Sequence, residues 1–352
     1  MPSFRPRTAA LAALLLVLAA CSKEAKRPAP LPYTIVDVPT PDLSAPAPAD
    51  IPDTLDLPAA DRAMADPPDR PADKPVVCQI NTRANTTGHA RLKLSFVDRF
   101  DRLQLDDQHW APHFDGGHDP VTHRWFGYDG LVKRSLPNGE EQVYVDAGFR
   151  GTGAIPLKLD PFSIKDGVLG ITADRTPPEL RSLLGNAHFT SGLLSSHKFF
   201  SQRFGYFELR ARMPAGKALW PAFWLLPTDR RWPPELDVFE VAGQKVDLIK
   251  FNLNWIDSKG WAHSPCQTHV PDAASAFHLY GVLWTADVVT WYIDRQPIAS
   301  APTPESMRTP MYLLINLAVG SHGSVGKSDA STPAPATLLI DHVAAWALDD
   351  TH

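Results

Sequence analysis

This sequence of 352 residues has few cysteines, no excess of positive charge and few long apolar runs. Only three cysteines occur, and none has the spacing of a metal-ligand motif, so no metal site is expected from them. Lys and Arg total 34 against 39 Asp and Glu, a formal net charge of -5 that gives no sign of a nucleic-acid partner. The apolar run from Ala9 to Ala20 is too short to span a membrane as a mature helix.

Residues 1–20 have the features of a secretory signal peptide. Arg5 and Arg7 precede the apolar run, which ends in Leu18-Ala19-Ala20-Cys21. That ending resembles a bacterial lipobox, which implies a lipidated Cys21 at the start of the mature protein. By the same resemblance Ser22 favours the outer membrane, facing the periplasm or the cell surface. A plain signal peptide with an incidental cysteine is the alternative.

Proline, in contrast, is abundant, with 35 residues in the chain. Many of them lie between Pro28 and Pro75, where Ala and Asp separate them and no helical or strand period is visible. Such a composition is typical of an extended, semi-rigid linker. We therefore predict a Pro-rich tether over residues 21–77 and a folded domain over residues 78–352.

The most informative stretch runs from Trp232 to Glu240 and carries three acids, Glu235, Asp237 and Glu240. In a β-strand Glu235 and Asp237 share one face, whereas strict alternation puts Phe239 rather than Glu240 on that face. One extra residue, a β-bulge, would bring Glu240 back to the side of the other two acids. The sequence therefore predicts a bulged strand with three acids on one face.

Three clustered carboxyl groups cannot all ionise freely, so at least one should hold a proton near neutral pH. A carboxylate and a carboxylic acid about 5 Å apart suit a retaining glycosidase, in which one attacks the sugar and the other protonates the leaving oxygen. The alternative is a solvated edge strand whose charges oppose aggregation.

The surrounding blocks decide between these interpretations. They are Gly205–Pro214, Trp220–Pro227, Tyr280–Thr285 and Met311–Gly320. Together with the acid motif they resemble glycoside hydrolase family 16, the laminarinase, lichenase, agarase and exopolysaccharide endoglycanase group, over about residues 94–348. The resemblance implies an all-β, jelly-roll β-sandwich of the concanavalin A type with a concave substrate cleft. It also implies Glu235 as nucleophile, Asp237 as its partner and Glu240 as acid/base, and it likens Glu141–Tyr144 to a strand beside the cleft.

Several other residues are candidate substrate ligands. Trp220 and Trp224 share one strand face and Trp232 stands just before the acids, so these rings could stack on sugars or belong to the core. Asn252 and Asn254 lie where many family members carry a histidine, and their amides could bind a sugar hydroxyl or a carboxylate. Arg210 could bind sugar hydroxyls or pair with Glu208.

With Cys21 lipidated, Cys78 and Cys266 are the remaining pair, and in an oxidising compartment a disulfide between them is expected, with two separate thiols as the alternative. No cofactor is expected, although Asp341 on the last strand could contribute to a structural calcium site as in some family members.

The combined prediction is a monomeric, lipid-anchored endo-acting hydrolase of the cell envelope. It would cut a β-linked polysaccharide, a bacterial exopolysaccharide or a β-1,3/1,4-glucan, with retention of configuration. A transglycosylase on the same fold and a non-catalytic carbohydrate-binding envelope lipoprotein are the two alternatives.

Overall fold

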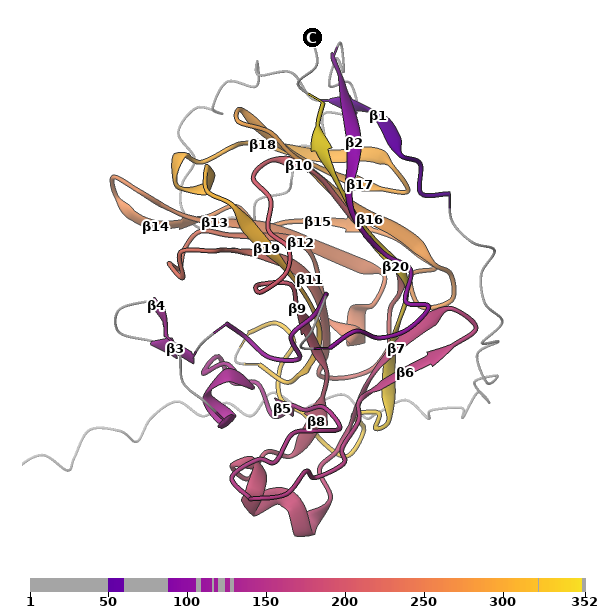
Figure 1. Ribbon diagram of the computed structural model, residues 1–352, viewed down its shortest axis with the longest axis vertical. Helices are drawn as coiled ribbons and strands as arrows, with labels where there is room; N and C mark the ends of the chain where they lie inside the picture. Colours follow the sequence, from indigo (N-terminus) through magenta and orange to yellow (C-terminus); the bar gives the residue numbers. More distant parts are fainter. Residues whose placement is uncertain are drawn as a thin grey trace, which may run out of the picture. The chain divides into compact units, whose positions relative to one another are not determined.

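The computed structural model describes residues 50–59 and 88–349, except for 106–108, 116, 120–123, 127–129 and 322. Within these ranges the chain is built mainly of β-strands (Figure 1). The helical segments in the same ranges are short 3-10 helices, η1 (Gly130–Lys133), η2 (Pro178–Leu184), η3 (Gly243–Lys245) and η4 (Glu305–Met307). None of them is long and apolar enough to cross a membrane.

The larger sheet has eleven strands. Its main path runs in the order β18 (Gln296–Pro302), β17 (Val288–Ile293), β16 (His278–Trp284), β10 (Gly205–Arg212), β20 (Ala336–Leu348), β7 (Val168–Arg175), β8 (Phe189–Ser191) and β5 (Gln142–Tyr144). Three strands join beside this path: β2 (Gly88–Asp98) on β20, β1 (Thr54–Ala59) on β2 and β6 (Phe162–Lys165) on β7. The pairings are antiparallel except for β5 with β8.

The smaller sheet has seven strands. Its order is β14 (Gly260–His263), β13 (Leu248–Asp257), β12 (Glu235–Val241), β11 (Leu219–Pro227), β19 (Met311–Val319) and β9 (Leu193–Ser195), with β15 (Cys266–His269) also paired to β13. A separate two-stranded ribbon consists of β3 (Gly117–Asp119) and β4 (Arg124–Phe126).

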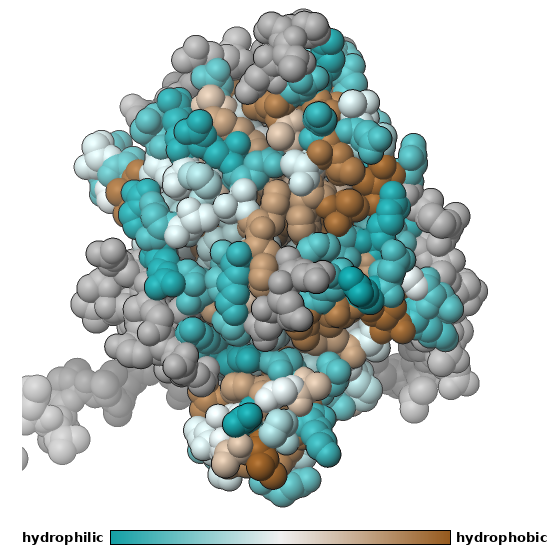
Figure 2. Space-filling view, in the orientation of Figure 1, coloured by the Kyte–Doolittle hydropathy of each residue, from teal (hydrophilic) through white to brown (hydrophobic). Residues whose placement is uncertain are grey.

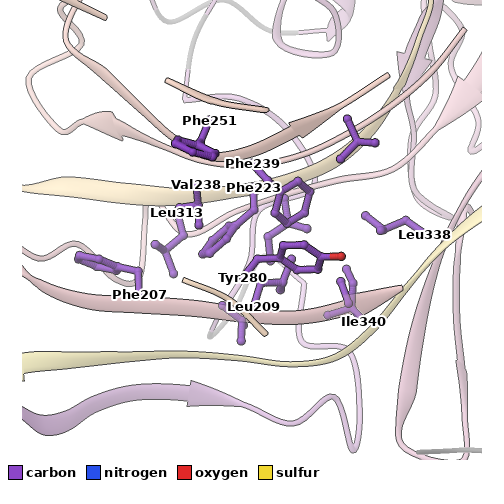
Figure 3. Close-up of a cluster of buried hydrophobic side chains, with 14 of the residues drawn as sticks. Phe207, Leu209, Phe223, Val238, Phe239, Phe251, Tyr280, Leu313, Leu338 and Ile340 are labelled. Atoms are coloured by element: carbon purple, nitrogen blue, oxygen red, sulfur yellow. The ribbon is translucent and has the colours of Figure 1, made fainter. Parts of the chain in front are cut away.

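The hydrophobic core lies between the two sheets, as the close-up in Figure 3 shows. Phe207 and Leu209 on β10 belong to the same buried cluster as Phe223 on β11 and Phe239 on β12. Each strand alternates side chains between its two faces, so one face of each sheet can be apolar while the other carries polar groups. Full burial of one such side chain contributes about 1.5–3 kcal/mol. The predicted all-β sandwich is confirmed.

The surface in Figure 2 shows hydrophilic residues over much of one face, with hydrophobic residues gathered in several patches between them. Among the described residues, the large apolar side chains that are exposed are Ile155, Ile164, Ile256 and Trp261. Trp261 lies beside the predicted acids, as described below.

The predicted tether boundary is wrong in one respect. Residues 50–59, which lie inside the predicted tether 21–77, form β1 and its lead-in, and β1 pairs along its whole length with β2. Leu55 and Leu57 are buried in a cluster with Trp346 and Tyr292. The alternating Thr-Leu-Asp-Leu pattern lets two leucines face the sheet, and Pro58 is tolerated because β1 is an edge strand. The rest of the predicted tether and the signal peptide lie outside the described residues.

Cys266 at the start of β15 is disulfide-bonded. Both other cysteines, Cys21 and Cys78, lie outside the described residues, so the pairing of Cys78 with Cys266 and the lipidation of Cys21 stay predictions.

Candidate active site

The predicted bulge lies in the middle of β12. The ladder pairs Asp237 with Asn252 and Glu240 with Lys250, so three steps on β12 face two steps on β13. The neighbouring β11 shows the same irregularity against β12. Val238 and Phe239 both point into the core. Glu240 therefore returns to the face that holds Glu235 and Asp237, and this prediction is confirmed.

The three carboxyl groups line one cavity on the face of the smaller sheet opposite the core, with a volume of about 100 Å³. The other lining residues come from β5, β11, β19 and the segment before β5: Leu136, Asn138, Glu140, Tyr144, Trp220, Ala222, Trp224, Asn316 and Ala318. Strands far apart in the chain thus build one polar site with an aromatic wall.

Glu235 accepts hydrogen bonds from two fixed side chains. Trp232 donates its Nε1–H to Oε2 over 3.0 Å, and Asn254 donates from Nδ2 to Oε1 over 2.7 Å. Burial raises the pKa of Glu235 to about 7, with a further contribution from the charge of Glu240. The two donors oppose this rise because they stabilise the ionised form.

Asp237 lies deepest of the three acids, with 3% of its surface exposed. Burial, followed by the charges of Glu235 and Glu240, raises its pKa well above the ordinary value, and a hydrogen bond from Asn252 only partly opposes this. Burial also raises the pKa of Glu240, against the Lys250 charge and a hydrogen bond from Trp220.

The three acids differ in their surroundings. Glu235 has two donors that favour its ionised form, whereas burial raises the pKa of all three acids. One ionised and one protonated carboxyl group in the same cavity can act as a nucleophile or base and as a general acid. The predicted sharing of protons among the three acids agrees with the raised pKa of each.

Of the three candidate tryptophans, Trp220 and Trp224 line the cavity and Trp232 contacts Glu235 without being part of that lining. Trp224 is 7% exposed, donates its Nε1–H to Asn316 Oδ1 over 2.7 Å and packs edge-on against Phe114. Trp232 and Trp220 are half-buried, and each indole hydrogen-bonds a catalytic-site acid. Trp232 and Trp220 therefore hold two of the carboxyl groups, Trp224 forms part of the cavity wall, and stacking on a sugar stays a prediction.

Asn252 and Asn254 are also brought to the site. Asn254 binds Glu235 and, through Oδ1, accepts a hydrogen bond from Trp261 over 3.3 Å. Asn252 binds Asp237. Of the two partners that the sequence allowed, a sugar or a carboxylate, the structure shows the carboxylate.

The predicted role of Arg210 in substrate binding is wrong. Arg210 lies on β10 in the larger sheet, where Nη1 is 3.2 Å from Asp341 Oδ2 and the guanidinium lies over the Phe277 ring. Its alternative partner Glu208 is instead held by Arg295, through two hydrogen bonds of 2.9 Å. Asp341, considered above as a calcium ligand, also contacts His342 at 2.8 Å.

Two groups at the site were missed from the sequence. Glu140 lines the cavity next to Tyr144, and burial raises its pKa to about 7 against hydrogen bonds from Asn138 and Gln142. The family resemblance places a strand beside the cleft at Glu141–Tyr144, which begins one residue after Glu140. Glu141 itself lies elsewhere and accepts a hydrogen bond from Ser328. Trp261, 57% exposed and 5.9 Å from the Trp232 ring, comes from the short hairpin strand β14, which carries no motif.

The fold and the acid cluster together match the family expected from the sequence, and comparison with known proteins agrees. The chain belongs to glycosyl hydrolase family 16, whose family model matches residues 159–337, a range that contains all three acids. The predicted family resemblance is confirmed.

Among curated proteins, the chain is similar to two endo-1,3-1,4-beta-glycanases of Rhizobium meliloti. It is 37% identical to ExsH and 38% identical to EglC, in each case over 258 residues, 73% of this chain and 52% of the relative. The chain thus spans about half the length of these relatives.

Solved structures show the same fold. The laminarinase of Rhodothermus marinus is 25% identical with a TM-score of 0.56, over 74% of this chain and 98% of that one. The laminarinase catalytic domain of Thermotoga maritima is 22% identical with a TM-score of 0.57, over 74% of this chain and 99% of that one. The sandwich is therefore the jelly-roll fold of this family, as predicted.

Proposed function

We propose that the protein is an endo-acting hydrolase that cuts a β-linked polysaccharide with retention of configuration. The observation that carries this proposal is the bulge in β12, which gathers Glu235, Asp237 and Glu240 in one cavity. Membership of the family and the printed activities of the Rhizobium relatives support it.

In the proposed reaction Glu235 attacks the anomeric carbon while Glu240 gives its proton to the leaving oxygen, and a glycosyl ester forms on Glu235. Glu240, now ionised, takes a proton from water, and that water breaks the ester. The two hydrogen bonds to Glu235 orient it for attack and disperse its charge. No step needs a cofactor.

Asp237 has an electrostatic role in this scheme. It lies between the two glutamates in sequence, and the charges of Glu235 and Glu240 help to raise its pKa, which favours its protonated form. A protonated Asp237 keeps the cluster from carrying three negative charges, and so allows Glu235 to stay ionised while Glu240 keeps its proton.

The proposed substrates are a mixed β-1,3/1,4-glucan or a bacterial exopolysaccharide. The names of the two Rhizobium relatives support the mixed linkage. We further propose that the protein is a monomer anchored to the outer membrane by a lipid on Cys21, on the strength of the lipobox-like segment. Incorporation of labelled palmitate into the wild type but not into Cys21→Ala tests the anchor.

Reducing-end release from a panel of β-glucans and exopolysaccharides tests the activity, with Glu235→Gln as the matched variant. We expect the wild type to cut one polymer at internal bonds and the variant to be inactive on it. Equal binding of a polymer by both proteins without cleavage would favour the carbohydrate-binding alternative. Longer products at high acceptor concentration would favour the transglycosylase.

A further inference from the structure

Lys250 on β13 stands directly across the ladder from Glu240. Its side chain therefore rises from the same face of the sheet as the acid, and its charge lowers the pKa of Glu240. The ammonium donates a hydrogen bond to Ser324 Oγ over 2.5 Å. Among the residues that the structure describes, no carboxylate forms an ion pair with this ammonium.

A second cavity of about 260 Å³ opens at Lys250. Asn138, Trp220 and Glu240 line both this cavity and the catalytic one, so the two cavities adjoin at the acid. The far wall is formed by Ser321 and by the turn Gly323, Ser324 and Val325. Gln244 fixes this turn, because its Nε2 donates to the carbonyl oxygens of Ser324 and Val325 over 3.1 and 2.9 Å.

The lining of this cavity carries a positive charge. Among the described residues of its lining Lys250 is the basic one, and Ser324 beside it offers a hydroxyl proton. The ammonium has three protons and uses one for Ser324, so the others can be donated to a ligand. A half-buried ammonium with a neighbouring hydroxyl is a site for an anion with two acceptor oxygens.

We propose that this cavity binds a carboxylate-bearing sugar unit of the polysaccharide, with Lys250 as its counter-ion and Ser324 as a second donor. The inference rests on the proposed function and narrows its substrate class to acidic β-glycans. The carboxylate would lie next to Glu240 when that group carries the proton it donates, so the two do not repel each other before the bond is cut.

The test compares two polymers with the same backbone, barley β-1,3-1,4-glucan and its carboxymethylated form. The measured quantity is the ratio of kcat/KM for the acidic polymer to that for the neutral one. We expect Lys250→Met to lower this ratio about tenfold, the effect of losing one hydrogen bond to a charged group. Lys250→Arg should keep most of the ratio. Lys245→Met removes an exposed charge outside both cavities and should leave the ratio unchanged.

Thermal melts of each variant establish that it is folded before its ratio is interpreted. An unchanged ratio in Lys250→Met, or an equal fall in Lys245→Met, would overturn the inference, because the first result excludes a local counter-ion and the second indicates a general charge effect. If the wild type cuts neither polymer, the proposed activity on this backbone fails, and electrophoresis through gels containing each polymer decides the inference on its own. Retardation by the acidic polymer that Lys250→Met abolishes would support it, and equal retardation of both proteins would refute it.

Discussion

Asn254 offers the sharpest test of how the catalytic cluster is controlled. Its Nδ2 lies 2.7 Å from Glu235 Oε1, and it donates one of the two hydrogen bonds that stabilise the ionised form of this acid. Asn254→Leu keeps a similar volume but removes the donor. The pKa of Glu235, already raised to about 7 by burial, should therefore rise further.

The size of the shift follows from the strength of the lost bond. A hydrogen bond to a charged group contributes about 1.5–3 kcal/mol, and one pKa unit corresponds to about 1.4 kcal/mol. The acidic limb of the kcat/KM profile should thus move upward by about one to two pH units, because the nucleophile must be ionised to attack. Activity at pH 6 should fall much more than activity at pH 9.

The assay is the initial rate of reducing-end release at low substrate concentration from pH 4 to 10. Trp232→Phe removes the other donor, at 3.0 Å, and should move the same limb in the same direction. A variant whose rate falls equally at every pH, with the limb in its original place, would refute the argument. Asn254 would then position substrate or protein rather than set the charge of Glu235.

The remaining predictions concern stability and the corrected assignments. Because burial raises the pKa of Glu235 from 4.5 to about 7, the folded protein loses stability as pH rises through this window, so Glu235→Gln should stabilise it by about 3 kcal/mol at pH 8 and hardly at pH 4, measured by urea unfolding. Arg295→Met leaves the Glu208 carboxylate, 0% exposed, without its bidentate partner and should cost about 3 kcal/mol in the same assay, whereas a cost below 1 kcal/mol would mean that the pair adds little. Arg210→Ala should leave kcat/KM unchanged and cost about 1 kcal/mol of stability. A loss of activity without a loss of stability would mean that Arg210 does bind substrate. Leu57→Ala should lower the free energy of unfolding by about 2–4 kcal/mol, since the side chain is 2% exposed. An unchanged unfolding midpoint would mean that residues 50–59 belong to the tether and not to the folded domain.

The acid cluster could be predicted from the sequence because its geometry is local. Side chains alternate along a strand, so the odd spacing between Asp237 and Glu240 requires one extra residue if they are to share a face. The core positions Val238 and Phe239 follow from the same count. The resemblance of the neighbouring sequence blocks to the family then predicts the sheet in which this strand lies.

The errors concern contacts between distant segments. The partner of Arg210 is Asp341 on the adjacent strand β20, and nothing near Arg210 in the chain indicates which face of which sheet it occupies. The strand β1 is short and surrounded by prolines, and its burial depends on Trp346 near the other end of the chain. Glu140 was missed because it comes just before a strand, where the periodic pattern no longer fixes the direction of a side chain.

The bulge in β12 also bears on how this site can change in evolution. The position of Glu240 on the cavity side depends on how many residues separate it from Asp237, and only weakly on which apolar residues these are. Substitutions at Val238 can therefore alter the core while the acids keep their face. The loss of a single codon between the two acids would restore strict alternation, so the three acids would share one face of a regular strand and the bulge would no longer be needed. The cluster thus tolerates point substitution and a change to even spacing, whereas the present odd spacing requires the bulge.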